Sequence, residues 1–215
     1  LHTKVVLVMT GILLFSGAVL FLLFESGKTM PFGERILTAF FNSVTARTAG
    51  FNTVELAALS PASAALMIIL MIIGGAPGST AGGIKVTTFV TLLAGTLASA
   101  RQVSATNIFK RRIEGDLVRQ ASAIATIYFS VVSLGIVSVA AIERIDLSWV
   151  TFEVVSALSN VGVTMGITGS LSVASKLILC LLMYFGRVGM MSLVIALAAK
   201  RENIPISRPA ENLLL

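Results

Sequence analysis

Two short polar segments, each carrying a glycine, interrupt the apolar stretches of this chain and hold the residue types best suited to chemistry. They are residues 43–53, Ser-Val-Thr-Ala-Arg-Thr-Ala-Gly-Phe-Asn-Thr, and residues 157–165, Ala-Leu-Ser-Asn-Val-Gly-Val-Thr-Met. Backbone carbonyls can replace the hydration shell of a monovalent cation, and a glycine lets the chain adopt the turn that points them inward. Non-helical backbone at membrane depth is tolerated only where protein buries it or where it lines a water-filled path. Two such segments in one chain therefore predict a pore.

Eight residues are the candidates for lining this path with carbonyl groups. They are Thr48, Ala49, Gly50 and Phe51 in the first segment, and Asn160, Val161, Gly162 and Val163 in the second. They would form two walls of a filter for a monovalent cation, although neither wall has the symmetric Thr-Val-Gly-Tyr-Gly sequence. The alternative is that both segments are ordinary turns between helices. Their repetition and the half-length helices predicted beside them favour the filter.

The composition is that of a membrane protein. Hydrophobic residues make up 56% of the 215 residues and charged residues only 12%. Cys180 and His2 are the only residues of their types, which leaves no pair for a disulfide, no cluster for a resident metal and no material for histidine-based catalysis. The net charge of +6 marks cytoplasmic loops in a membrane protein more often than a nucleic-acid partner. We therefore expect a multi-pass membrane protein that is not an enzyme, holds no cofactor and has no nucleic-acid partner.

The helices that must position the first polar segment follow from apolar length. Residues 5–24 carry no charge and, at about 1.5 Å per residue, cover the ~30 Å hydrocarbon core as a spanning helix. Residues 34–46 form a helix too short to span. This helix ends at the polar segment, as a re-entrant pore helix does when it points the negative end of its dipole at the path. Ser60 and Pro61 are typical of a helix start, and the apolar residues after them end at Ile73, too early to cross alone.

A stretch with five glycines and one proline in twelve positions, residues 74–85, separates that short helix from another short apolar stretch at 86–100. The basic residues of 102–119 favour one helix interrupted by this stretch over two helices that cross separately. A phosphate-binding loop is excluded because Ile84 stands where that pattern requires lysine. We expect an intramembrane gating loop, with a packing kink as the alternative. The residues concerned are Gly74, Gly75, Gly78, Ser79, Thr80, Gly82, Gly83 and Lys85.

The second half of the chain repeats this order. Helices are predicted over 120–142 and 147–158, the second polar segment follows, and a last helix covers 172–199, interrupted by Gly-Arg-Val-Gly around Arg187. An arginine in the middle of a membrane helix must face protein or water. In the pore it would raise the barrier to a cation, and beside the glycine-rich stretch its five donors could bind carbonyls. A purely structural arginine is the alternative.

A shift of 112 residues aligns the two halves, because it pairs Gly50 with Gly162 and Gly74 with Gly186. We therefore expect an all-α membrane protein with two tandem repeats of helix, pore helix, filter and helix, the second helix of the first repeat being broken by the glycine-rich loop. Two such units are half of a pseudo-four-fold pore. The expected organisation is a first repeat at 1–101, a basic cytoplasmic linker at 102–119, a second repeat at 120–201 and a cytoplasmic tail at 202–215.

Four motifs in this order resemble a known family. Residues 45–53, 74–85, 160–166 and 186–187 are similar to the third and fourth pore repeats of the Trk/Ktr/HKT potassium transporters, and Ala-Pro-Gly-Ser-Thr-Ala-Gly-Gly leans towards the Ktr branch. The resemblance implies the C-terminal half of a cell-membrane subunit for K⁺ uptake, gated by the loop and Arg187. It also implies the first two pore repeats of the same polypeptide, a homodimer, and cytosolic regulatory subunits of the RCK/KTN type that would hold any nucleotide.

Two other functions stay open on the residues alone. A secondary cation transporter would use broken helices for alternating access, although usually with inverted repeats and an intramembrane carboxylate in a long helix. A non-conducting scaffold subunit would tolerate side chains at Gly50 and Gly162. Glu153, on the second short helix, is expected to have a hydrogen-bonded or water-facing structural role. The basic linker either docks a cytosolic partner or contacts anionic lipid.

Overall fold

The computed structural model describes residues 1–25, 30–103, 106–109 and 111–189. The end of the last predicted helix, 190–199, and the tail at 202–215 therefore lie outside the described residues. In chain order the elements are α1 His2–Phe24, α2 Phe32–Thr45, the 3-10 turn η1 Leu56–Ala58, α3 Pro61–Ile72, α4 Val86–Ala100, β1 Thr106–Ile108, β2 Arg111–Ile113, α5 Gly115–Ile142, α6 Leu147–Leu158 and α7 Val173–Val188.

Among the described residues, two helices, α1 and α5, are long and apolar enough to cross a membrane. They contain 23 and 28 residues, which at about 1.5 Å per residue exceeds the ~30 Å thickness of the hydrocarbon core. Both expose large apolar side chains on their outer faces, such as Phe15 at 70% and Leu134 at 68% exposure. An apolar outer face of this kind suits a lipid surrounding.

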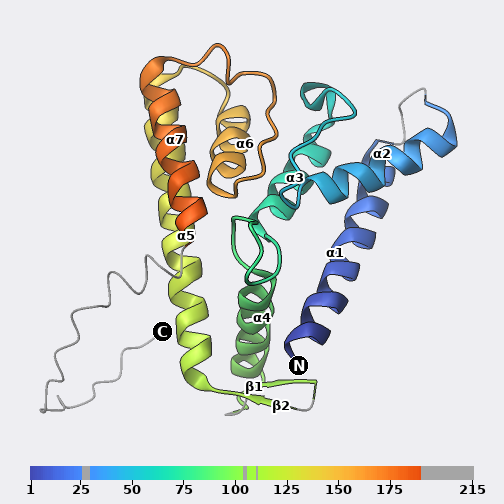
Figure 1. The fold of residues 1–215 in the computed structure, drawn as a ribbon, viewed down its shortest axis with the longest axis vertical. Helices are drawn as coiled ribbons and strands as arrows, with labels where there is room; N and C mark the ends of the chain where they lie inside the picture. Colours follow the sequence, from blue (N-terminus) through green and yellow to red (C-terminus); the bar gives the residue numbers. More distant parts are fainter. Residues whose placement is uncertain (26–29, 104–105, 110, 190–215) are drawn as a thin grey trace, which may run out of the picture.

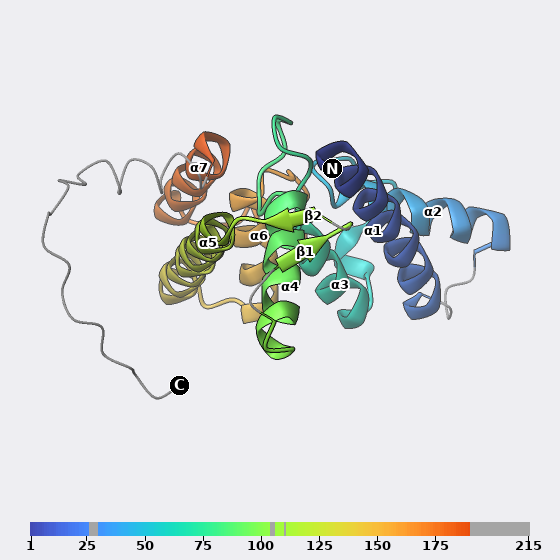
Figure 2. The same cartoon turned by 90° about the horizontal axis from the view of Figure 1, so that it is seen from below.

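The helices α3 and α4 lie one above the other, with residues 73–85 between them (Figure 1). In the same view α1 runs on one side of this interrupted segment, and α5 with α7 runs on the other. Figure 2, seen from below, likewise places α4 between α5 and α1. The short helices α2 and α6 lie at the level of α3. The two polar segments that follow α2 and α6 are thereby brought to the middle of the molecule.

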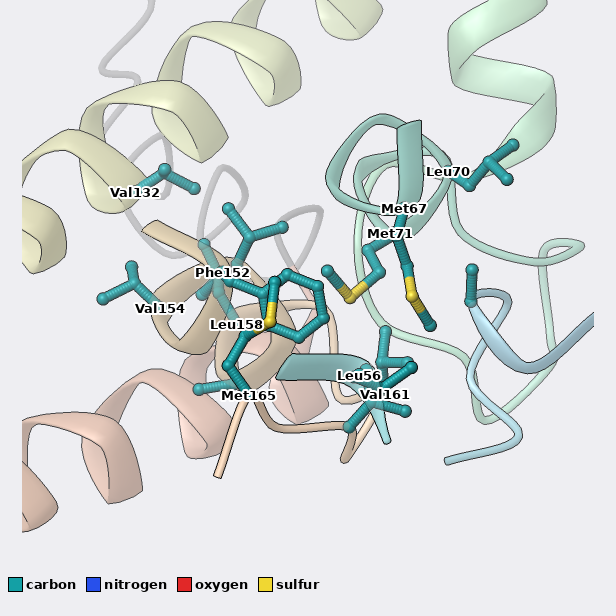
Figure 3. Packing of buried hydrophobic residues seen from close by; sticks show 14 of the residues in the cluster. Leu56, Met67, Leu70, Met71, Val132, Phe152, Val154, Leu158, Val161 and Met165 are labelled. Atoms are coloured by element: carbon teal, nitrogen blue, oxygen red, sulfur yellow. The ribbon is translucent and has the colours of Figure 1, made fainter. Parts of the chain in front are cut away.

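The buried core joins α3 to α6. Met67 and Met71 of α3 belong to one cluster with Phe152 and Leu158 of α6, and all four side chains are fully buried. Figure 3 shows the two methionines beside the Phe152 ring, with Val161 of the second polar segment close by. Methionine packs well against aromatic rings because its thioether is polarizable and its chain is flexible. The two halves of the chain are therefore fixed to each other by packing around the polar segments.

The same capping arrangement begins a helix in each half. The hydroxyls of Ser60 and Ser172 accept hydrogen bonds from the backbone N–H three residues later, at 3.2 and 3.3 Å. A carboxylate at the end of the preceding long helix binds the cap residue itself: Glu25 Oε1 accepts from Ser60 N at 2.9 Å, and Glu143 Oε1 from Ser172 N at 2.7 Å. Hydrogen bonds from the side chain and backbone of Ser172 lower the pKa of Glu143, so this cap is formed at neutral pH and weakens as acid protonates the carboxylate.

The predicted linker at 102–119 is where the structure departs from the expected all-α fold. Strands β1 and β2 pair antiparallel there. The turn residue Phe109 has a left-handed φ of 47°, a conformation that tight hairpin turns need, and Lys4 Nζ lies 5.3 Å from its ring centroid. Helix α5 begins at Gly115, earlier than the predicted 120, because Asp116 in the first turn stabilises the helix start. The apolar signal could not show this polar first turn.

Helices α1 and α2 approach each other closely at Gly17. A Cβ atom at that position would lie 2.4 Å from Ser43 Oγ and 3.0 Å from a methyl group of Leu70. Ser43 Oγ donates a hydrogen bond to Leu14 O at 2.9 Å. The glycine therefore allows α2 to hydrogen-bond directly to the backbone of α1.

We expect Gly17→Val to destabilise the folded protein by about 1–3 kcal/mol, the usual cost of overpacking a closed interface. Gly11→Val is the matched control on the same helix, since a Cβ atom at Gly11 meets nothing within 4 Å. Thermal unfolding of the purified complete protein measures both, and the Gly17 variant should melt at the lower temperature. Equal melting temperatures would contradict the close approach.

Candidate functional site

The backbone alternates in handedness through both polar segments. In the first, Thr48 and Gly50 have φ angles of 69° and 78°, and in the second, Asn160 and Gly162 have φ angles of 52° and 89°. The residues between and after them are not in the left-handed region. Successive carbonyls of a regular strand point to opposite sides, whereas left-handed residues alternating with ordinary ones turn them to the same side. Each segment therefore has the alternation that lets its carbonyl oxygens face one side, and the two segments 48–51 and 160–163 are here called the carbonyl rows.

A hydroxyl from the end of each short helix fixes the last carbonyl of its row. Thr45 Oγ1, at the end of α2, donates to Phe51 O at 2.6 Å and accepts from Phe51 N at 3.0 Å. Ser156 Oγ, in α6, donates to Val163 O at 2.5 Å. Both helices end where the rows begin, so the negative ends of their dipoles lie next to the carbonyl rows.

The two rows lie against each other at Gly50. A Cβ atom added there would lie 2.5 Å from Val161 O, so no other residue fits without moving the second segment. At Gly162 the surroundings leave room for a Cβ, whose nearest atom would be Gly50 Cα at 3.9 Å, and its left-handed φ is what favours glycine. All eight residues predicted to line a path thus stand in two adjoining segments.

Glu153 of α6 is buried behind the second segment, with 5% of its surface exposed. Its carboxylate accepts hydrogen bonds from Met165 N at 3.0 Å, from Thr168 Oγ1 at 2.8 Å and from Thr164 Oγ1. It also lines a cavity of about 380 Å³ together with Asn160 and Gly162. The expected hydrogen-bonded structural role is confirmed, and the carboxylate holds the chain that leaves the second row.

Residues 74–85, here called the glycine loop, are closed at the neck by backbone hydrogen bonds. Gly74 N donates to Ile84 O at 2.9 Å, Ile84 N to Ile72 O at 2.9 Å, and Val86 N to Gly75 O at 3.1 Å. The loop also touches the second segment, because a Cβ atom at Gly82 would lie 2.4 Å from Ser159 O. The loop thus joins α3 to α4 and packs against the start of the second carbonyl row.

Three cationic side chains bind carbonyl oxygens of the glycine loop. Arg187 Nη1, from α7, donates to Thr80 O at 2.8 Å. Lys85 Nζ donates to Ser79 O at 3.2 Å and to Ala81 O. Arg47 Nη2, from the residue before the first row, donates to Gly74 O at 3.2 Å. Arg187 and Lys85 were expected at this place. Arg47 was not, although a charged residue next to a polar segment at membrane depth is itself a signal.

A cavity of about 740 Å³ adjoins the loop. Its lining comes from the loop, from the starts of α1, α4 and α5 and from the end of α7, and among the described residues it includes Lys85 and Arg187 but no carboxylate. Nor do the described parts of the chain contain a group of three or more histidine, cysteine or acidic side chains that could hold a metal. The described side chains that carry charge beside the loop, Lys85 and Arg187, are therefore cationic, and the carboxylate of Glu153 lies in the other cavity, next to the second row.

An apolar helical frame around two adjoining polar segments is typical of a membrane transport protein. The chain belongs to the TrkH family of cation transport proteins, whose family model matches residues 3–205. It is 38% identical to the potassium/sodium uptake protein NtpJ of Enterococcus hirae, over the whole chain and 50% of that protein. It is 35% identical to the Ktr system potassium uptake protein B of Vibrio alginolyticus, over the whole chain and 48% of that protein.

The fold is also that of a solved relative. The crystal structure of the potassium transporter TrkH from Vibrio parahaemolyticus matches with a TM-score of 0.76 at 23% identity, over 91% of this chain and 44% of that one. This likeness shows the fold alone. The chain spans about half the length of the curated relatives it matches.

We expect Glu153→Ala to destabilise the protein by about 1–3 kcal/mol, because it leaves the buried Met165 N–H and two threonine hydroxyls without their acceptor. Glu55→Ala is the control, since Glu55 is an exposed acidic residue in the loop that follows the first segment. The melting temperature of the purified complete protein is the measurement. A loss no greater than that of the Glu55 variant would show that these hydrogen bonds contribute little.

Proposed function

We propose that this chain forms part of a path for K⁺ uptake across the cell membrane, with the two carbonyl rows as walls of a selectivity filter. The observation that carries the proposal is the alternation of left-handed residues, Thr48 and Gly50 in one row and Asn160 and Gly162 in the other. A row of oxygens on one side can replace the hydration shell of a dehydrated monovalent cation. The relatives named above as potassium uptake proteins support K⁺ as the ion.

The two rows account for two sides of such a filter. We infer that each half of the chain is one pore repeat, made of a long helix, a short pore helix, a carbonyl row and a further helix. Two more repeats of the same polypeptide would complete a pseudo-four-fold ring, consistent with a chain of about half the length of its relatives. On this reading Arg101, Arg111, Arg112 and Arg119, which lie around the hairpin, mark the cytoplasmic side.

The glycine loop and Arg187 form the proposed gate. The loop lies against the start of the second row through Gly82, and Arg187 binds its Thr80 carbonyl. A positive charge in a narrow passage of low dielectric repels a cation more strongly than the same charge in water. We infer that this arrangement is the closed one and that K⁺ would pass when the loop and the guanidinium move apart. A homodimer and cytosolic regulatory subunits that bind nucleotide belong to the same proposal.

The filter proposal is tested by Gly50→Ser in the complete protein, reconstituted in proteoliposomes. The added side chain would be strained at a φ of 78° and would meet Val161 O, so the carbonyl rows must shift. We expect the ratio of K⁺ to Na⁺ flux to fall about tenfold, equivalent to ~1.4 kcal/mol of discrimination. Gly11→Ser serves as the control on an open helix face. An unchanged ratio in well-inserted protein would fit a scaffold subunit and would refute the filter.

The gate proposal is tested by Arg187→Gln. We expect basal K⁺ flux per folded molecule to rise about tenfold, since the variant removes both the charge and the hydrogen bond to Thr80 O. Arg187→Lys preserves the charge and should stay near the wild-type flux. If Arg187→Gln instead lowers the folded yield and leaves flux per molecule equal to wild type, the arginine serves structure and not gating.

A further inference from the structure

The residue that precedes each carbonyl row differs between the two halves, although the rows themselves match. In the second half it is Ser159, whose Oγ lies 2.7 Å from the hydroxyl of Tyr128 on α5, and Tyr128 is completely buried. In the first half, 112 residues earlier, the corresponding pair is Ser16 and Arg47. The larger side chain of the pair is Tyr128, on the spanning helix, in the second half. In the first half it is Arg47, just before the row.

In the first half, Ser16 and Arg47 therefore do not make the hydrogen bond that joins Tyr128 to Ser159 in the second half. The Ser16 hydroxyl turns back to Leu13 O of its own helix at 3.4 Å. The Arg47 guanidinium reaches the other way, across to Gly74 O at the neck of the glycine loop. The second row has the same alternation of left-handed residues with a serine at this position. The backbone conformation of a row therefore does not require an arginine before it. The arginine stands in the half whose row is followed by the glycine loop.

Arg47 is also placed at a cost. Its Nη1 atom is buried and has no hydrogen-bond partner among the described residues, and no carboxylate pairs with it there. Burying a cation without a counter-charge costs desolvation free energy, which its hydrogen bonds offset only in part. The hydrogen bond that Arg47 does make is to the loop. The N–H of the same residue, Gly74, donates to Ile84 O, so Arg47 binds the loop at the residue that joins its two ends.

We propose that Arg47 is a positioning residue that couples the glycine loop to the first carbonyl row. The proposal rests on the filter and gate described above. The guanidinium holds the loop neck, and the Arg47 backbone leads directly into Thr48, which is held at a φ of 69°. Movement of the loop is therefore transmitted to the row, and a change in the row alters the grip on the loop. Arg187 differs, because it binds the loop tip and touches neither row through a hydrogen bond.

The test compares Arg47→Gln and Arg47→Lys with Arg187→Gln in the complete protein in proteoliposomes. Three quantities are measured: basal K⁺ flux per folded molecule, the ratio of K⁺ to Na⁺ flux, and hydrogen exchange of the loop amides at 76–83. Arg144→Gln is the control, because Arg144 is exposed on the connection between α5 and α6. Arg47→Lys keeps the positive charge, so it still tests the proposal if Arg47→Gln fails to fold.

We expect Arg47→Gln to raise basal K⁺ flux and loop exchange about tenfold, as the loss of one hydrogen bond from a charged donor would, and also to lower the K⁺ to Na⁺ ratio several-fold. Arg187→Gln should raise flux and exchange with its ratio unchanged, and Arg47→Lys should lie between Arg47→Gln and wild type. Faster exchange with an unchanged ratio would make Arg47 a loop anchor only, and a changed ratio with unchanged exchange would make it a residue of the row only. Either result overturns the coupling. Absence of K⁺ flux in the wild type would refute the proposed function, while the exchange measurement would still test the tether.

Discussion

The structure depends on where backbone carbonyl groups find partners in an apolar surrounding. Helices satisfy their own carbonyls, but the two polar segments and the glycine loop cannot, and each unpaired group in hydrocarbon costs several kcal/mol, on the order of a lost hydrogen bond. The chain meets this constraint in two ways. Hydroxyls of Thr45 and Ser156 fix the ends of the carbonyl rows, and cationic side chains bind the loop. The row carbonyls left over are the ones proposed to meet an ion.

The two halves share one plan and differ where each has its own task. Matching capping serines, matching carboxylates at the ends of long helices and matching φ angles show the shared plan. Glu153 has no acidic counterpart 112 residues earlier, where Phe41 stands. Arg47 has only a serine as its counterpart. In the proposed filter, such differences would let one side be held rigidly while the other side stays linked to the glycine loop.

Sequence reasoning predicted the features that are local. It gave the bounds of the helix at 147–158 and the capping serine at residue 60. Both depend only on residues close together in the sequence, namely the length of an apolar run and the residue at its start. It placed Arg187 beside the loop because glycine spacing repeats. It missed the contact of Arg47 with Gly74 and the pairing of Tyr128 with Ser159, which join residues about thirty positions apart. It also missed the hairpin, whose strands are too short to leave a periodic pattern.

The contacts of the glycine loop have a consequence for rate. Gly74 and Gly82 meet their neighbours through backbone atoms, since a Cβ atom at either would overlap a carbonyl oxygen at 1.9 or 2.4 Å. These two glycine contacts involve no side chain, whereas the side chains of Ala81 and Ile84 in the same loop are buried. Displacing the loop would therefore require three cationic side chains to exchange their hydrogen bonds and the Ala81 and Ile84 side chains to leave the core, which is a motion of a whole element on the microsecond to millisecond scale. As the proposed gate, such a loop would open no faster than it moves as a whole.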